Sequence, residues 1–328
     1  MKLLTVFRPA AAVATALLFS CAAWAQGDAW PSRPITLVTA SSAGSGTDLL
    51  ARELAQRLSA ELKQPVVVDN KPGGSGIIGT QAVVRAAPDG YTLLYTTGSN
   101  TVMAPALMKN LPYDVTKDLA PVAQTVEGGV ILHVSNDMPV KNLPELVQLV
   151  KSNPGKYSYG TWGVGSSGHL TMEWLKRKTG MEMPHVAYKQ SSQLLTELAT
   201  GTLKIGFTDP GAPLPFIETK RLRSIAVTGI VRLPRTPDIP TFQEQGYDFE
   251  PVGWFGVLAP AHTPAPIVER LGALITRIQN QPDMVKKVAA LNVQAAQAKS
   301  PAAFQAVIGR DLKMWKQIVA DTGITVDN

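Results

Sequence analysis

Two hydrophobic periods alternate along the chain and divide it into predicted strands and helices. Short runs rich in β-branched residues are typical of strands, and apolar residues that recur every three or four positions are typical of amphipathic helices. In the first hundred residues, strands are expected over residues 35–39, 66–69 and 91–97. Leucines spaced four apart predict a helix over 48–62, capped by Thr47 or Asp48. A second helix, expected before Ala87, completes a βαβαβ order.

The same alternation continues through the middle of the chain, which then ends in helices. Further strands are expected over residues 130–134, 157–162, 204–208 and 222–228. Further helices are expected over residues 143–152, 169–179, 193–200 and 264–279, followed by a long final helix with an apolar face from Phe304 to Val319. Right-handed βαβ crossovers build parallel sheets covered by helices on both faces, and such sheets bind ligands beyond the carboxyl ends of their strands.

Composition limits the class of protein. Of the 328 residues 45% are hydrophobic and 17% are charged, which excludes a disordered, collagen-like or polytopic membrane protein. The length is typical of two domains. The formal net charge is +6, and the basic residues are scattered rather than arranged in a stripe, so we expect no nucleic-acid partner.

Residues 1–25 have the pattern of a cleaved secretory signal peptide. Two basic residues precede an uncharged apolar stretch, and Ala23-Trp24-Ala25 fits the small-x-small rule for cleavage. We therefore expect a mature periplasmic protein that begins at Gln26. Cleavage would remove Cys21, the single cysteine, so the mature chain would have neither a disulfide nor a thiol nucleophile. A loose lipoprotein motif over residues 18–21 leaves lipid anchoring as the less favoured alternative.

Three glycine-rich loops follow predicted strands and lead into predicted helices. They span residues 41–47, 72–76 and 163–168. Unpaired backbone N–H groups and the positive end of the helix dipole suit such junctions to anions, and small side chains let a carboxylate approach the backbone. Any one of these loops could be an ordinary tight turn, but the three together favour a cleft for a polar ligand.

The sequence gives weaker support for a catalytic or cofactor-binding site than for a polar ligand cleft. Gly74-x-Gly76-x-x-Gly79 and Gly163-x-Gly165-x-x-Gly168 match the dinucleotide fingerprint in letters, but neither has an acidic residue at the end of the next strand to hold the ribose. The four histidines lack the spacing of metal ligands. A dispersed triad of Ser166 or Ser167 with His185 and Asp209 is conceivable, because triads are defined in space. We nevertheless expect no enzyme, no cofactor and no metal.

Several short motifs occur in a consistent order from about residue 29 to the C-terminus. They include Asn70-Lys71-Pro72-Gly73-Gly74-Ser75-Gly76, Ala87-Pro88-Asp89-Gly90-Tyr91, Leu111-Pro112-Tyr113-Asp114 and Trp254-Phe255-Gly256-Val257-Leu258-Ala259-Pro260. Together they resemble the Bug family, the extracytoplasmic solute receptors of tripartite tricarboxylate transporters.

The resemblance implies a two-domain α/β periplasmic binding protein of the type II-like class. Each domain would be a mainly parallel sheet flanked by helices, with the ligand cleft between the domains. Residues 26–127 and 254–328 would form one domain and residues 128–253 the other. A monomer would capture a small carboxylate, without catalysis or a cofactor, for the membrane subunits of a transporter. An alternative is a carboxylate-binding sensor or accessory protein that acts on a sensor kinase.

The family's binding loops can be placed on this sequence position by position. The first corresponds to residues 40–48, where Gly44 and Asp48 are kept but serine and alanine replace the usual phenylalanine and prolines. The third, over residues 163–170, keeps the pattern Gly-x-Gly-Ser-x-x-His-Leu. The predicted ligand-binding residues are Ser41, Ser42, Ala43, Gly44, Ser45, Thr47, Asp48, Trp162, Ser166, Ser167, Gly168, His169, Tyr188 and Asp209.

Three of these residues have a second interpretation. Asp48 could cap the helix or accept a hydrogen bond from a ligand ammonium. Tyr188 and Trp162 could pack in the core or form a wall of the ligand site. Because Trp162 directly precedes the third loop, its indole could stack on a flat acid, which predicts a preference for an aromatic carboxylate over citrate.

Overall fold

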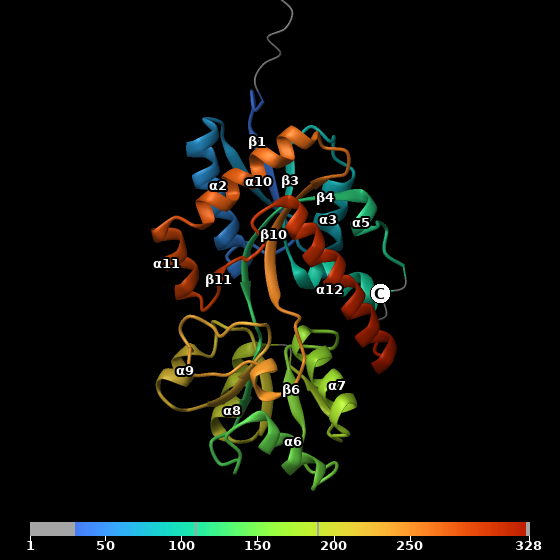
Figure 1. Cartoon of the computed structure of the whole chain (residues 1–328), viewed down its shortest axis with the longest axis vertical. Coiled ribbons are helices and arrows are strands. Elements are labelled where there is room, and N and C mark those ends of the chain that lie inside the picture. The colour runs from blue at the N-terminus through green and yellow to red at the C-terminus, as the bar shows by residue number, and fades with distance from the viewer. Residues whose placement is uncertain (1–29, 109, 189, 326–328) are drawn as a thin grey trace, which may run out of the picture.

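The chain folds into two lobes, each built on one β-sheet flanked by helices (Figure 1). The computed structural model describes residues 30–108, 110–188 and 190–325. The predicted signal peptide, its cleavage site and Cys21 lie outside the described residues. The two-domain α/β class expected from the sequence is confirmed by this arrangement.

The first lobe contains a six-stranded sheet with the order β11-β4-β10-β3-β1-β2. Its strands are β1 (Ile35–Thr39), β2 (Val66–Asn70), β3 (Thr92–Thr97), β4 (Leu119–Gly128), β10 (Gly253–Pro260) and β11 (Gln294–Ala295). Its helices are α2 (Gly46–Leu62), α3 (Ile77–Val84), α4 (Ala104–Leu107), α5 (Val115–Asp118), α10 (Ala265–Gln279), α11 (Pro282–Ala290) and α12 (Pro301–Thr322). Two shorter turns complete it, the 3₁₀ turn η2 (Gly74–Gly76) and the π-helical turn η3 (Ser99–Met103).

The second lobe contains a five-stranded sheet with the order β7-β6-β8-β5-β9. Its strands are β5 (Ile131–Val134), β6 (Tyr159–Thr161), β7 (His185–Ala187), β8 (Ile205–Thr208) and β9 (Arg223–Val227). Its helices are α6 (Leu143–Lys151), α7 (Ser167–Thr179), α8 (Ser191–Thr200) and α9 (Leu214–Glu218), with a 3₁₀ turn η4 (Gln243–Gln245).

Both sheets are mixed, which corrects the expectation of mainly parallel sheets. In the first lobe β1 pairs in parallel with β2 and β3, but β10 is antiparallel to β3 and β4. In the second lobe β6 pairs in parallel with β7 and β8, but β5 is antiparallel to β8 and β9. Strands β10 and β5 each follow directly after the chain has crossed from the other lobe, and their direction is opposite to that of the βαβ strands. In the first sheet the short strand β11 is also antiparallel to β4.

The chain crosses between the lobes at Gly128 and again at Gly253, which are paired in the ladder of β4 and β10. The domain boundaries predicted from the sequence, at 127/128 and 253/254, lie at this pair. The assignment of residues to two domains stays a prediction. Helix α12 packs against β4 and also against α7 of the second lobe. Trp315 on α12 meets Phe249 edge to face, with ring centroids 6.1 Å apart. One hydrophobic cluster therefore runs through both lobes.

The hydrophobic pattern predicted the centres of the elements better than their ends. The first helix begins at Gly46 rather than Asp48, because the Ser45 hydroxyl accepts a hydrogen bond from Asp48 N and caps it. The third loop shortens in the same way, since α7 begins at Ser167 instead of His169. The long strands β4 and β10, which join the lobes, were not among the predicted elements.

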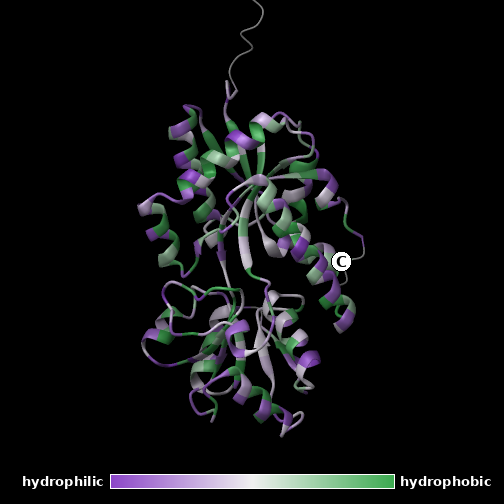
Figure 2. Cartoon of the chain, in the orientation of Figure 1, coloured by the Kyte–Doolittle hydropathy of each residue, from purple (hydrophilic) through white to green (hydrophobic). Residues whose placement is uncertain are grey.

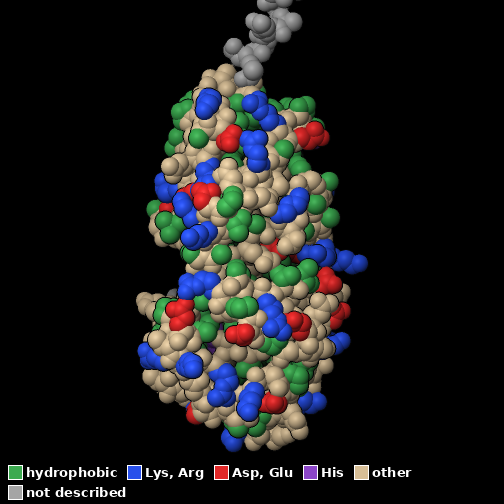
Figure 3. Space-filling model, turned by 60° about the vertical axis from the view of Figure 1, so that its left-hand side comes forward, with side chains coloured by type: hydrophobic (Ala, Val, Ile, Leu, Met, Phe, Trp, Pro, Cys, Tyr) green, Lys and Arg blue, Asp and Glu red, His purple; other side chains and the backbone are tan. Residues whose placement is uncertain are grey.

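Burial follows the amphipathic pattern. Strands and helices both contribute buried hydrophobic residues, and the helices carry polar residues on their outer faces (Figure 2). On the face in Figure 3 acidic and basic side chains are interspersed, without a stripe of one sign. Within the described residues, no helix is both long enough and apolar enough to cross a membrane.

Candidate functional site

A cavity of about 220 Å³ lies where the two lobes meet, and we call it the central cavity. Residues of both lobes and of both crossings line it: Thr97, Gly98, Ser99, Gly128, Val130, Trp162, Ser167, Ser191, Asp209, Pro210, Gly253, Trp254, Phe255 and Val293. An adjoining side cavity of about 280 Å³ shares Ser99 and Trp162 with it and also touches Asn100, Val164, Gly165 and Ser166. Of the predicted site residues, Trp162, Ser166, Ser167 and Asp209 therefore line these two cavities.

The N-terminus of α7 forms the wall of the second lobe. The Ser166 hydroxyl accepts a hydrogen bond from His169 N at 3.3 Å and caps the helix. Ser167 is the first helical residue and lines the central cavity. The N–H groups of a first helical turn lack partners within the helix, so this wall presents donors and a positive dipole end to an anion.

A network of polar side chains holds the third loop behind this wall. Thr161 Oγ1 lies 2.7 Å from His185 Nε2 and accepts a hydrogen bond from Ser166 Oγ at 3.0 Å. His169 Nδ1 accepts a hydrogen bond from Gly165 N at 3.0 Å. The rings of His169 and His185 stack with centroids 4.0 Å apart. The loop conformation is therefore held by contacts within the second lobe.

Burial makes both histidines of this stack poor bases. The pKa of His185 is lowered to about 4, mainly by desolvation and in smaller part by the neighbouring His169. Desolvation also lowers the pKa of His169. His169 is buried and lines neither the central nor the side cavity. In this structure it supports the loop through Gly165 rather than facing the cavities.

Gly168 is buried by packing, not exposed on a loop. A Cβ at Gly168 would lie 2.6 Å from Phe207 Cβ and 3.1 Å from Trp162 Cζ3. The missing side chain is therefore required for α7 to approach β8 and the indole. This contact also fixes one edge of Trp162, whose ring lines both the central and the side cavity.

Asp209 brings a carboxylate to the central cavity. Its Oδ1 accepts hydrogen bonds from Gly211 N at 3.0 Å and from Ala212 N at 2.9 Å. Ser191, the first residue of α8, lines the same cavity and was not predicted. The conceivable triad does not assemble, because His185 is bonded to Thr161 and Asp209 to backbone amides. Among the described residues, no group of three or more His, Cys, Asp and Glu could hold a metal ion.

Tyr188 is a core residue in this structure. Its ring packs in a cluster with the leucines of α8, and its hydroxyl donates a hydrogen bond to Glu197 Oε2 at 2.6 Å. A Cβ at Gly160 would lie 2.8 Å from the ring. Tyr188 lines neither the central nor the side cavity, so the packing interpretation fits its position.

The first loop is stabilised by its own contacts. Asp48 is 2% exposed, and its carboxylate accepts hydrogen bonds from Gly44 N at 2.8 Å, Arg52 Nε at 3.0 Å and Asn70 Nδ2 at 2.8 Å. Burial acts to raise the pKa of Asp48, but these hydrogen bonds outweigh it and the pKa lies below its ordinary value. The Asp48 carboxylate is thus engaged within the protein rather than directed at a ligand ammonium.

None of the other predicted residues of this loop lines the two cavities in this structure. These residues are Ser41, Ser42, Ala43, Gly44, Ser45 and Thr47. Ser41 Oγ lies 2.8 Å from Thr39 Oγ1, at the carboxyl end of β1. The role of this loop in ligand binding stays a prediction.

The wall of the first lobe comes from a segment that the sequence analysis missed. β3 ends at Thr97 and leads into the π-helical turn η3, so that Thr97, Gly98 and Ser99 line the central cavity. A Cβ on Gly98 would lie 3.0 Å from Trp254 Nε1, so a side chain here would require the indole to shift by a few tenths of an ångström. A signal was available in the sequence: small polar residues directly follow a predicted parallel strand, as in the three loops that were singled out.

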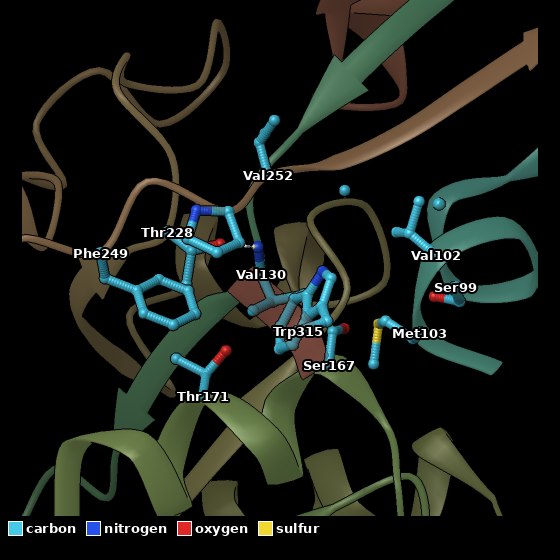
Figure 4. Close-up of a pocket in the computed structure, with 13 residues that line it drawn as sticks. Ser99, Val102, Met103, Val130, Ser167, Thr171, Thr228, Phe249, Val252 and Trp315 are labelled. Carbon is cyan, nitrogen blue, oxygen red and sulfur yellow. Dashed lines mark hydrogen bonds between the residues drawn. The ribbon is translucent and has the colours of Figure 1, made fainter. Parts of the chain in front are cut away.

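A smaller recess of about 30 Å³ extends the central cavity toward α12, and we call it the inner pocket (Figure 4). Ser99, Val102 and Met103 face Ser167 and Thr171 of α7 across it, and Phe249 and Trp315 also line it. The Thr171 side chain is 1% exposed, and its hydroxyl has no hydrogen-bond partner among the described residues. The inner pocket has room for a single small group or one water molecule.

Comparison with known proteins gives one consistent family. Residues 50–324 match the model of the tripartite tricarboxylate transporter family receptor. A UPF0065 protein of Bordetella bronchiseptica is 36% identical over 273 residues, which cover 83% of this chain and 81% of that protein. Protein BugT of Bordetella pertussis is 32% identical over 304 residues, which cover 92% of this chain and 93% of that protein.

Solved structures agree with the sequence relatives. The Rpa4515 protein of R. palustris, solved with adipate, is 31% identical with a TM-score of 0.74, over 90% of this chain and 99% of that one. MatC of Rhodopseudomonas palustris, solved with bound malate, is 27% identical with a TM-score of 0.72, over 88% of this chain and 100% of that one. The chain therefore belongs to the family of tripartite tricarboxylate transporter receptors, the Bug family that its motifs resemble.

Proposed function

We propose that this protein is a periplasmic receptor that binds a small carboxylate in the central cavity and delivers it to the membrane subunits of a tripartite tricarboxylate transporter. The observation that carries the proposal is the capped N-terminus of α7 at the wall of a cavity shared by both lobes. The relatives solved with adipate and malate support a carboxylate as the ligand class.

The ligand carboxylate would sit at the first turn of α7. Backbone N–H groups there and the Ser167 hydroxyl would donate to its oxygens. Hydrogen bonds to a charged acceptor are roughly twice as strong as neutral ones, so no arginine is needed. From the first lobe, Ser99 would contribute a further hydroxyl, and closure of the lobes would bury the ligand.

Asp209 would restrict the other end of the ligand. A second ligand carboxylate close to its side chain would be repelled, because like charges in a partly buried site disfavour each other. A neutral ring or a hydrogen-bond donor would be accepted there. With Trp162 as a flat wall, this arrangement favours an aromatic monocarboxylate over citrate.

A ligand screen tests the proposal. Purified mature protein would be heated with single mono-, di- and tricarboxylates and with aromatic acids. A ligand present at 100 times its dissociation constant is expected to add about 2.7 kcal/mol to the free energy of unfolding. Calorimetry would then give the affinity of each positive compound. Failure of every carboxylate to stabilise the protein would contradict the proposal.

Location and processing are tested separately. Osmotic-shock fractions of the producing cells are expected to contain the protein, and intact-mass analysis is expected to show Gln26 as its first residue. A mass that includes an acylated Cys21 would instead show a lipid-anchored receptor. Gel filtration with light scattering would check the expectation of a monomer.

A further inference from the structure

A further cavity of about 180 Å³ lies between the lobes beside α12, and we call it the rear cavity. Half of its lining residues are polar and half are apolar: Gln124, Glu127, Glu250, Gln297 and Arg310 are the polar ones, and Ile230, Val231, Val252, Ala298 and Val307 the apolar ones. Of these residues only Val252 also lines the inner pocket, and none lines the central cavity. The rear cavity is therefore separate from the proposed carboxylate site.

The Glu127 carboxylate is buried in this cavity without a cationic partner. Its side chain belongs to a residue that is 6% exposed. It accepts hydrogen bonds from Gln294 Nε2 at 3.1 Å, Gln297 N at 3.4 Å and Gln124 Nε2 at 3.4 Å. All three donors are neutral, and within the described residues no lysine or arginine nitrogen lies within 4.0 Å of it. A buried carboxylate whose donors are all neutral, two of them at 3.4 Å, is incompletely compensated.

An irregularity in the sheet places a second acceptor beside Glu127. Residues three apart in a regular strand point to opposite faces. Between β4 and β10 the register shifts, because Phe255 pairs with Val126 whereas Gly256 pairs with Gln124. The extra residue on β4 brings Gln124 and Glu127 to the same side. Gln124 is 3% exposed, and its Oε1 has no hydrogen-bond partner within the described part of the chain.

The one arginine at the cavity is already engaged. Arg310 donates from Nε and Nη2 to Asp311 Oδ1, at 3.1 and 3.0 Å. Glu250, which belongs to the second lobe, adds a second carboxylate to the lining. The polar part of the lining is thus rich in acceptors, whereas Ile230, Val252 and Val307 contribute aliphatic surface to the cavity.

We infer that the rear cavity binds a small organic cation, an ammonium group carried on a short aliphatic chain. An ammonium has three donors, which match the Glu127 carboxylate, the unpartnered Gln124 oxygen and the Glu250 carboxylate. The aliphatic chain would lie along the valine and isoleucine side chains. A bare metal ion would leave this apolar surface unused. Because the lining comes from both lobes, the bound cation would contact both.

The test uses n-butylammonium as the probe and 1-butanol as its uncharged analogue, with the whole mature protein. Calorimetry or ligand-observed NMR is expected to show binding of n-butylammonium but not of 1-butanol. Glu127→Gln removes the charge, and Val307→Phe fills the cavity from its half-buried wall. Each is expected to weaken binding at least about tenfold. Glu269→Gln, an exposed glutamate on α10, is the matched control and should bind as the parent does.

Three results would overturn the inference. They are absence of n-butylammonium binding, equal binding of 1-butanol, and unchanged affinity in a folded Val307→Phe variant. Circular dichroism would establish that each variant is folded, and Val307→Phe decides the matter if Glu127→Gln does not fold. The carboxylate screen is independent of this test, so failure of one proposal is distinguishable from failure of the other.

Discussion

Gly128 and Gly253 are paired where the chain crosses between the lobes, and a Cβ on Gly253 would lie 2.8 Å from the carbonyl oxygen of Gly128. We predict that Gly253→Ala lowers the free energy of unfolding by about 1–3 kcal/mol, because the added methyl group forces the two strands apart. Urea denaturation monitored by circular dichroism measures the change.

Gly309 gives a matched control for this substitution. It lies within α12, and a Cβ there would meet no atom within 4 Å. Gly309→Ala is therefore expected to raise the stability by about 0.5–1 kcal/mol, as alanine does in a helix interior. Equal effects of the two substitutions would show that the crossing tolerates a side chain.

The cap of α7 is predicted to act in both stability and binding. Ser166→Ala removes the hydroxyl that accepts from His169 N, which should cost about 1 kcal/mol of stability. It also loosens the first turn at which the carboxylate is proposed to bind, so calorimetry should show weaker affinity for any carboxylate found in the screen.

Ser300→Ala separates the two effects. Ser300 caps α12 in the same way, since its hydroxyl accepts from Ala303 N at 3.1 Å, but it lies in neither the central nor the side cavity. It should cost similar stability with unchanged carboxylate affinity. A Ser166→Ala variant that binds as tightly as Ser300→Ala would place the carboxylate away from α7.

Trp162 is predicted to select aromatic ligands. Trp162→Ala should weaken binding of an aromatic acid by roughly 1 kcal/mol, in the range of aromatic stacking, and leave binding of an aliphatic acid nearly unchanged. Intrinsic fluorescence of parent and variant, titrated with both acids, gives the two affinities. If aromatic acids bind the parent no better than citrate, the predicted preference is wrong.

Acid should destabilise the second lobe through His133. This side chain is fully buried between the hydroxyls of Ser224 and Thr208, and desolvation lowers its pKa to about 3. The unfolded chain binds a proton near pH 6.5, so the stability that neutral His133 provides is present above that pH and lost as the pH falls toward 3. The expected loss is about 2 kcal/mol at pH 5 relative to neutral pH.

His133→Gln removes this titration while keeping a hydrogen-bonding side chain. Denaturation curves at pH 7.5 and pH 5 should differ less for the variant than for the parent, although the variant is less stable at neutral pH. An equal acid response in both proteins would assign the loss to other groups.

The local pattern of the sequence was sufficient to predict the βαβ elements and the part of the cavity wall that the third loop contributes. Ser166 and Ser167 follow a strand and precede an amphipathic stretch, so the chemistry of their position could be inferred without contacts. Trp162 was placed at the site because of its neighbour Gly163, and its ring does line both cavities.

Other parts depend on contacts between distant residues. The sequence around Tyr188 does not predict its contacts with Glu197 and Gly160. The sequence around Gly168 does not predict its contact with Phe207. The sequence does not predict a partner for the Asp48 carboxylate outside its own helix, but Asn70 at the end of the next strand donates a hydrogen bond to it. Strand β10 was missed because its pairing partners lie more than a hundred residues away.

The position of β10 also imposes an order on assembly. In the first sheet this strand lies between β3 and β4, yet it is made last of the three and after the whole second lobe. During synthesis from the N-terminus, the edges of β3 and β4 that pair with β10 therefore stay unpaired until residues up to Pro260 have been made. Unpaired strand edges can pair with wrong partners. All strands of the second sheet lie within one continuous stretch of chain, so this sheet can form before β10 has been made and the first sheet is complete.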